Sequence, residues 1–309
     1  MSNRMTILGL FVFASVWTCA GGIPAEGSDL RLRKALVTRQ SDRALAVTHG
    51  LFDHVKDRVN YLEDDCDLHA PVRVDEIKVA VVGEFMNACS TGVKPAEVKD
   101  LTKDSPAEIT GVFRIWFEHP GKKDEILTEE EPLAPYKTSN PAHAVEIHPI
   151  VRAAGQDFFA AIGPIEHDGK LYKAKGPKQL RTLLKRRVTI QEFDGEDGDL
   201  YVSIESGCCL PNYFRLDAVL ASSPKKTADG YWATVDIPSA GTPAAQGLRV
   251  FSIDGTNANV AFKALKKKSK ITFWGITRMD GKKILQAAED HPGEARPIPV
   301  EFVLLAIEK

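Results

Sequence analysis

The sequence lacks the short motifs that mark the commonest enzyme and metal-binding classes. It contains no Cys-x-x-Cys pair, so a zinc site built from cysteines has little support. It also contains no Gly-x-Ser-x-Gly elbow, no Gly-x-x-x-x-Gly-Lys-Ser/Thr loop, no Gly-x-Gly-x-x-Gly turn and no His-Glu-x-x-His helix. The serine hydrolases, nucleotide hydrolases, dinucleotide enzymes and zinc proteases that use these motifs are therefore not indicated.

The sequence also lacks an excess of charge of one sign. Its 40 lysines and arginines are balanced by 42 acidic residues, which leaves a formal net charge of −2. Net charge therefore gives no support to nucleic acid as a partner. Hydrophobic residues make up 43% of the chain and charged residues 27%, which is typical of a globular protein and not of a disordered one.

Long apolar runs are missing after the first 20 residues, so we expect no membrane span there. Residues 1–20 contain Arg4, then a short apolar run and small residues, which is the pattern of a cleaved secretory signal peptide. We expect cleavage near Ala20 and export to the periplasm or the cell exterior. Cys19 raises a lipoprotein anchor as the alternative, although residues 16–18 are a poor context for lipid attachment.

Cysteine is scarce, with five residues in the chain, and four of them follow the expected cleavage point. An exported protein reaches an oxidising compartment, in which disulfides form. Cys66 and Cys89 are expected to form one, because it would tie two neighbouring predicted strands. Cys208 and Cys209 are adjacent, and a bond between them would be strained, so we interpret them as two small buried side chains.

Period-two alternation and β-branched or aromatic content predict many short strands. Residues 21–40 are small and charged and are expected to form a flexible segment, followed by a first unit at 41–155 and a second at 156–309. The predicted strands are 65–73, 76–86, 108–118, 143–152, 187–194, 199–205, 212–220, 230–237, 248–253, 271–278 and 299–307. Helices are predicted at 176–187 and after Thr256.

Short strands with one interposed helix, and no repeating βα alternation, favour small barrels over a parallel sheet. The sequence therefore predicts a mainly β protein of two small β-barrel-like (OB-like) units with a few helices. Two segments of the first unit align with two of the second: 108–120 with 270–281, and 144–153 with 299–308. The second unit is accordingly interpreted as a diverged repeat, in which Glu301 matches Glu146.

Alternation also predicts which side chains share a face, since residues two apart in a strand point to the same side. In 143–152 the apolar Val145 and Ile147 belong to the core, so Glu146 and His148 point away from it. The other strands of the first unit also carry polar or aromatic side chains on their non-core side. The predicted face comprises Asp67, His69, Arg73, Glu84, Arg114, Trp116, Glu146 and His148.

Three interpretations of this face stay open, and the favoured one is ligand binding. The protein would then be an exported binding or accessory protein for an oligosaccharide, another anionic polymer or a small molecule. By analogy with OB-folds, Trp116 would stack on the ligand while Arg73 and Arg114 engage anionic groups. A purely structural network, in which the polar groups satisfy one another, is a further alternative.

The remaining interpretation is a metal-dependent hydrolase. Two imidazoles and a carboxylate suit zinc or a similar divalent ion, with one position left for water. The ligands would be His69, His148 and one carboxylate, with Asp67 chosen ahead of Glu84 and Glu146. His143 is left out of this set, because on a regular strand it faces away from Glu146 unless the turn before it bends it back.

Two basic runs, 263–270 and 185–187, lie in the second unit. We interpret them as solvated helix ends, since lysine is favourable near a helix C-terminus. Contact with phosphates or an acidic polymer is the alternative.

Four motifs of the first unit resemble those of a set of uncharacterised exported bacterial proteins with an OB-like domain. They are Asp67-Leu-His69, Asn87-Ala-Cys89, Ile109-Thr-Gly111 through His119, and Val145-Glu146-Ile-His148-Pro149. The resemblance covers residues 60–153 and implies an exported domain with a shared polar constellation, in a family with no assigned activity. The last motif departs from the family pattern at Val145, where the family has tryptophan.

Overall fold

A computed structural model describes residues 27–119, 126–127, 135–193, 198–205, 210–239 and 242–308 of the protein. The expected signal peptide and the Cys208–Cys209 pair lie outside these residues. Every helix within them is too short or too polar to cross a lipid bilayer.

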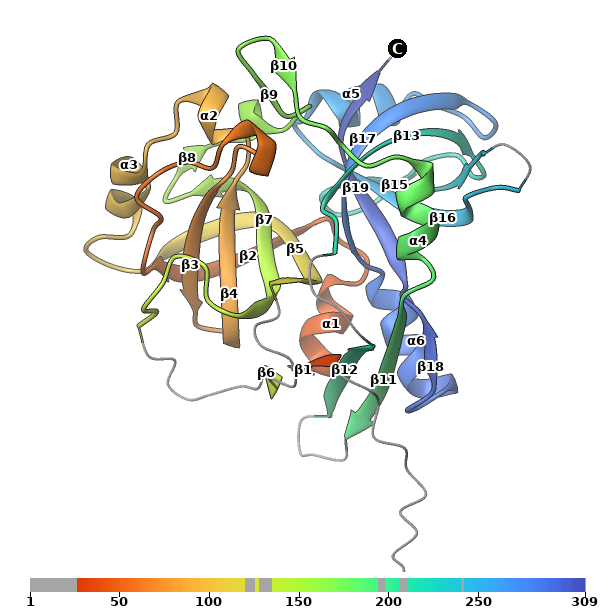
Figure 1. The fold of residues 1–309 in the computed structure, drawn as a ribbon, viewed down its shortest axis with the longest axis horizontal. Helices are drawn as coiled ribbons and strands as arrows, with labels where there is room; N and C mark the ends of the chain where they lie inside the picture. Colours follow the sequence, from red (N-terminus) through yellow and green to blue (C-terminus); the bar gives the residue numbers. More distant parts are fainter. Residues whose placement is uncertain are drawn as a thin grey trace, which may run out of the picture.

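The first β-rich unit is a closed five-stranded barrel (Figure 1). Its ring order is β4-β3-β2-β5-β7, and β7 closes the ring by pairing with β4 in parallel. The bounds are β2 Leu45–Phe52, β3 Leu68–Val74, β4 Ile77–Phe85, β5 Ala107–His119 and β7 His143–Ala153, with β8 at Gln156–Asp157 on the edge. The connection from β4 to β5 carries the helices α2 (Ala88–Thr91) and α3 (Pro95–Leu101).

The second unit contains a ring of five strands in the order β13-β17-β19-β16-β15, closed between β13 and β15. The bounds are β13 Tyr213–Leu220, β15 Gly230–Ile237, β16 Ala245–Ile253, β17 Lys270–Met279 and β19 Val300–Glu308, with β14 at Lys225–Lys226 beside β15. Helix α5 (Asn257–Phe262) lies between β16 and β17, where Thr256 caps it by accepting a hydrogen bond from Asn259.

Both rings have the same topology. Taken in chain order, the first strand pairs with the second and the fourth, and the fifth lies between the third and the fourth. In each ring the third and fifth strands are parallel, and a helix follows the third strand. The prediction of two small OB-like barrels in a mainly β protein is therefore confirmed.

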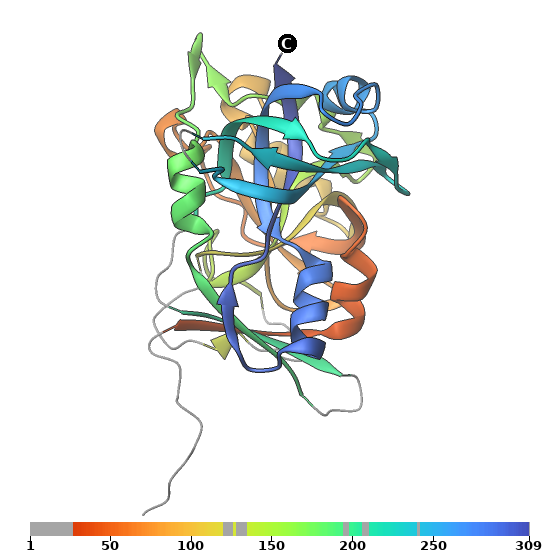
Figure 2. The ribbon, with the colours of Figure 1, turned by 90° about the vertical axis from the view of Figure 1, so that its right-hand side faces the viewer.

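A third sheet lies below the two barrels in Figure 1 and draws its strands from distant parts of the chain. Its order is β18-β11-β12-β1-β6, with bounds β18 Ala295–Pro297, β11 Arg187–Phe193, β12 Asp199–Glu205, β1 Gly27–Arg33 and β6 Ile126–Leu127. Helices α1 (Lys34–Gln40) and α6 (Gly281–Asp290) contact each other beside this sheet (Figure 2). Helix α4 (Pro177–Leu183) and the hairpin β9–β10 (Glu166–His167, Lys170–Leu171) precede β11.

The prediction of a flexible segment at 21–40 is wrong for residues 27–40, which form β1 and α1. Leu30 and Leu32 alternate along β1 and are at most 1% exposed, and Val37 of α1 is 2% exposed. The high charge of this segment obscured its apolar alternation. Strand β2 and helix α6 were also missed, whereas each predicted strand overlaps an observed one.

The two barrels pack against each other through the outer faces of β5 and β17. Arg114 Nε of β5 donates a hydrogen bond to the carbonyl oxygen of Thr277 on β17, at 2.7 Å. In return, Arg278 Nη1 of β17 donates to the carbonyl oxygen of Phe113 on β5, at 3.1 Å. Each arginine therefore donates to a backbone carbonyl of the other barrel. That carbonyl belongs to the residue just before the other arginine.

Candidate metal centre

Neighbouring strands of the first barrel bring most of the predicted polar side chains together. His69 on β3 lies opposite Glu84 on β4, and Arg114 on β5 lies opposite Glu146 on β7. Because β4 pairs with β7, the two pairs are adjacent, and His148 lies two residues along β7 on the same face. Barrel closure therefore converts separate strand motifs into one cluster.

The cluster is not open to solvent. It does point away from the interior of its own barrel, as predicted, but the second barrel packs on it and contributes Tyr213, Asn212 and the backbone of Thr277. The exposed fraction is at most 6% for seven of the eight predicted residues: Asp67, His69, Glu84, Arg114, Trp116, Glu146 and His148.

Tyr213 of β13 connects the two barrels at the centre of the cluster. Its hydroxyl donates to Asp67 Oδ2 at 2.5 Å and lies 2.5 Å from His148 Nε2. On the other side of the ring, His148 Nδ1 lies 3.1 Å from Glu84 Oε2 and 3.4 Å from Glu146 Oε2. His148 is therefore surrounded by three carboxylates. Nothing in the sequence around Tyr213 indicates this role, since it depends on how the barrels dock.

Arg114 is the permanent cation of the cluster. Its guanidinium forms an ion pair with Glu146 and donates to Asn212 Oδ1 at 2.7 Å. Trp116 lies under this guanidinium, with the ring centroid 5.7 Å from the Arg114 Cζ atom. Trp116 is therefore a packing partner inside the protein and not the exposed stacking platform that ligand binding would require.

Arg73 does not belong to the cluster. Its Nε lies 3.2 Å from Asp53 Oδ2, and its side chain is 32% exposed. The two arginines that were predicted to engage an anionic ligand therefore have other partners. Arg114 is buried in the cluster, and Arg73 pairs with Asp53.

His143 reaches the cluster, contrary to the expectation that it faces away. Its Nε2 lies 3.5 Å from Glu146 Oε1, and its Nδ1 lies 2.7 Å from the carbonyl oxygen of Pro141. The pairing of β5 with β7 shifts register between Ile115–Val145 and His119–His143. This irregularity at the start of β7 breaks the alternation on which the expectation relied.

A carbonyl oxygen only accepts hydrogen bonds, so the contact with Pro141 requires a proton on His143 Nδ1. Its Nε2 faces Glu146 Oε1 across 3.5 Å. Among the described residues, neither atom has a hydrogen-bond partner, and the same is true of Oε1 and Oε2 of Glu84. Four polar atoms in a fully buried region therefore have no hydrogen-bond partner among the described residues.

Burial and the neighbouring charges act on the titration of these groups in opposite directions. Burial raises the pKa of Glu84 well above its usual value, with partial opposition from His148. Burial acts the same way on Glu146, but Arg114 and the two histidines outweigh it and hold its pKa well below the usual range. Burial would lower the pKa of His148, but Glu84, Asp67 and Glu146 raise it well above normal.

Two further carboxyl groups border the cluster, and both have raised pKa values. Burial raises the pKa of Glu118 to about 7, and burial with the charge of Asp67 raises that of Asp65. His69 stays neutral at ordinary pH, because burial lowers its pKa to about 3. The buried region thus holds more acid than base, and it favours uptake of positive charge.

Two overlapping groups of side chains place ligand atoms within 4.8 Å of one another: Asp67, Glu84 and His148, and Glu84, His143 and Glu146. The predicted metal ligands were His69, His148 and one carboxylate, with Asp67 chosen ahead of Glu84 and Glu146. Asp67 and His148 do fall in the first group, while His69 lies on the other side of Glu84, its Nε2 3.7 Å from Glu84 Oε2. A buried group able to hold a metal is therefore present, with Glu84 at its centre.

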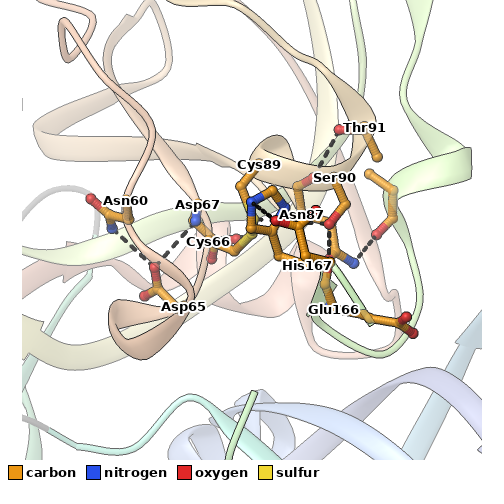
Figure 3. Close-up of a disulfide and its surroundings, with 12 residues drawn as sticks. Asn60, Asp65, Cys66, Asp67, Asn87, Cys89, Ser90, Thr91, Glu166 and His167 are labelled. Carbon is orange, nitrogen blue, oxygen red and sulfur yellow. Dashed lines mark hydrogen bonds and ion pairs between the residues drawn. A yellow bond between two sulfur atoms is a disulfide. The ribbon is translucent and has the colours of Figure 1, made fainter. Parts of the chain in front are cut away.

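The Cys66–Cys89 disulfide is confirmed and lies beside the cluster (Figure 3). It joins the residue before Asp67 to α2, with 5.4 Å between the Cα atoms. The backbone N–H of Asn87 donates to Asp67 Oδ1, and its side-chain amide donates to the carbonyl oxygens of Ala161 and Pro164. The disulfide is compatible with an exported protein.

The corresponding positions of the second barrel keep the ion pair and lose the rest of the cluster. Arg278 on β17 lies opposite Glu301 on β19, just as Arg114 lies opposite Glu146. The strand registers then match Glu84 with Phe251 and His69 with Trp232. Beside Phe251 lies Val303, where the first barrel has the His148–Pro149 pair. Apolar packing therefore replaces the potential ligands, and Glu301 provides a matched control for Glu146.

No protein-family model matches this chain, and no curated protein matches it either.

Proposed function

We propose that the protein is an exported metal-binding protein whose first barrel holds one divalent ion through Glu84, His143 and Glu146. The observation that carries this proposal is that His143 Nε2 and Glu146 Oε1 face each other 3.5 Å apart, fully buried and without a hydrogen-bond partner among the described residues. Such an arrangement is repulsive unless a cation or a proton lies between the two atoms.

The donor set and its surroundings support a metal ion at this place. Two carboxylates and an imidazole suit zinc and similar divalent ions. The hydrogen bond from His143 Nδ1 to Pro141 orients the ring in the way that outer partners orient metal-binding histidines. A divalent charge would also offset the excess of buried acid around Glu84.

The burial of the cluster favours a structural ion over a catalytic one. A hydrolase needs a coordination position that water and substrate can reach, whereas Glu84, His143 and Glu146 are at most 1% exposed. An oligosaccharide on this face would have to displace the second barrel. We therefore propose that the ion fastens the first barrel at its contact with the second, in support of a binding or accessory role.

The test is the metal content of the full chain, purified without chelators and measured by elemental mass spectrometry. We expect about one equivalent of a divalent metal in the wild type and in Glu301→Gln, and a loss of most of it in His143→Ala and Glu146→Gln. Glu301→Gln removes the matching buried carboxylate of the second barrel, so it controls for general loss of stability.

A second measurement separates loss of the ion from loss of the fold. Zinc or manganese added to chelator-treated protein should raise the melting temperature of the wild type by several degrees. An ion at about 100 times its dissociation constant contributes roughly 2.7 kcal/mol. His143→Ala should not respond. A wild type that carries no metal and does not respond to added ions would refute the proposal and leave a protonated structural network.

A further inference from the structure

The second barrel carries a dense group of exposed lysines on adjacent segments. Lys225 and Lys226 form β14, Lys263 ends α5, Lys266–Lys268 form the turn that follows, and Lys270 begins β17. The segments are held together, because the backbone N–H of Lys267 donates to Ser223 Oγ and that of Lys268 to the carbonyl oxygen of Leu220. We call these seven residues the lysine pole.

The positive charge of the lysine pole is largely uncompensated. Lys226 pairs with Asp254 at 2.6 Å, but the other six lysines form no ion pair with any residue that the structure describes. Lysines elsewhere do find carboxylates, as in Lys99–Asp57 and Lys282–Asp42. In a chain of net charge −2, this concentration of unpaired cations at one end is an electrostatic footprint.

The chemistry of the pole distinguishes between classes of anionic partner. It contains lysine and no arginine, and lysine acts as a hydrated point charge without the fork that arginine offers to individual phosphates. Single-stranded nucleic acids also require free aromatic faces for stacking. Here the Lys225 Nζ lies 5.5 Å from the Trp232 ring and the Lys226 Nζ 4.9 Å from the Tyr231 ring, so each ring already has a cation over it.

An exposed apolar side chain accompanies the lysines. Val260 on α5 is 59% exposed, and Lys263 and Ala264, three and four residues later on the same side of this turn, are exposed too. A cluster of four to eight basic residues attracts a protein to an anionic lipid surface, and an exposed apolar side chain beside it adds contact with the lipid. We propose that the lysine pole binds the surface of a membrane rich in anionic phospholipid.

Sedimentation with lipid vesicles tests this proposal on the full chain. The wild type should sediment with vesicles that contain about one third phosphatidylglycerol, and not with pure phosphatidylcholine vesicles, and high salt should release it. Lys266→Gln/Lys267→Gln/Lys268→Gln should weaken partitioning about a hundredfold, since each lysine near such a surface contributes roughly a factor of five.

The control removes the same charge elsewhere. Lys94→Gln/Lys99→Gln/Lys103→Gln changes the first barrel and should partition like the wild type. Both triple variants should melt within a few degrees of the wild type, because all six lysines are on the surface. Equal weakening in the two variants, no binding to anionic vesicles, or tighter binding to a single-stranded DNA oligonucleotide than to the vesicles would each overturn the proposal.

Discussion

Single residues at the junction of the barrels resolve a difficult electrostatic problem. A buried ion pair is costly unless further hydrogen bonds satisfy its members. Arg278 pairs with Glu301 at 2.7 Å and donates to the carbonyl oxygens of Arg43, Ala44 and Phe113. Every nitrogen of this guanidinium therefore has an acceptor, and the same residue that pairs with Glu301 also links the two barrels.

Glu301 should make the stability of the protein depend on pH. Burial raises its pKa to about 7, against 4.5 for an ordinary glutamate, although Arg278 and Arg249 oppose the effect. Between these values the folded state binds a proton that the unfolded state lacks. The stabilisation that comes from the protonated Glu301 carboxyl is therefore fully present below about pH 4.5. It is lost as the pH rises through about 7.

The comparison of wild type with Glu301→Gln isolates this contribution. The free energy of unfolding of the wild type minus that of Glu301→Gln should fall by about 2 kcal/mol between pH 5 and pH 8. This follows from roughly 1.4 kcal/mol per pKa unit. Urea unfolding of both proteins at the two pH values measures it. A difference that stays constant with pH would show that Glu301 is already ionised at pH 5.

At the scale of elements, the disulfide closes the loop between the entry to β3 and the exit from β4. Cys66 has a positive φ of 67° and Asn87 one of 53°, so both turns hold conformations that side chains rarely adopt. The covalent link and the hydrogen bond from Asn87 to Asp67 stabilise these turns together. They keep Asp67 aimed at Tyr213.

Loss of the disulfide should cost about 3 kcal/mol of stability, the entropy of closing a loop with 23 residues of separation. Guanidinium unfolding of Cys66→Ser/Cys89→Ser against the oxidised wild type gives the value. The reduced wild type is the control and should match the double variant. A loss below about 1 kcal/mol would mean that the turns hold their conformation without the link.

At the scale of the whole molecule, the barrels and the third sheet are interlocked. Strand β1 comes from the start of the described chain but pairs with β12 along its full length, and β12 also pairs with β11. Tyr213, Arg114 and Arg278 cross the junction between the barrels. Separation of the barrels would leave several buried charged groups without partners, so we expect them to unfold together.

Hydrogen exchange in rising denaturant tests this expectation. Peptides from β5 and from β17 should lose protection over the same range of urea concentration, because each strand supplies hydrogen bonds to the other barrel. Peptides from α3, at the edge of the first barrel, should exchange earlier and serve as the internal reference. Protection that persists in β17 after β5 has exchanged would show that the barrels fold independently.

The sequence by itself determined most of the longer strands, the disulfide and the face to which most of the predicted polar side chains point. The strands and their faces depend on local alternation of side chains. In a regular strand this alternation holds whatever lies nearby, as Glu146 and His148 illustrate. It also matched Glu146 with Glu301, and both proved to pair with an arginine of the neighbouring strand.

Only the tertiary structure decided what covers that face. Tyr213 and Asn212 come from residues far along the chain, and their position depends on how two barrels dock, which no local pattern encodes. The contact of His143 with Glu146 likewise depends on a shift in register between β5 and β7. From alternation alone this face is predicted to bind a ligand, but the docked barrels bury it as an enclosed, acid-rich cluster. Desolvation then acts on the whole arrangement and not on single residues.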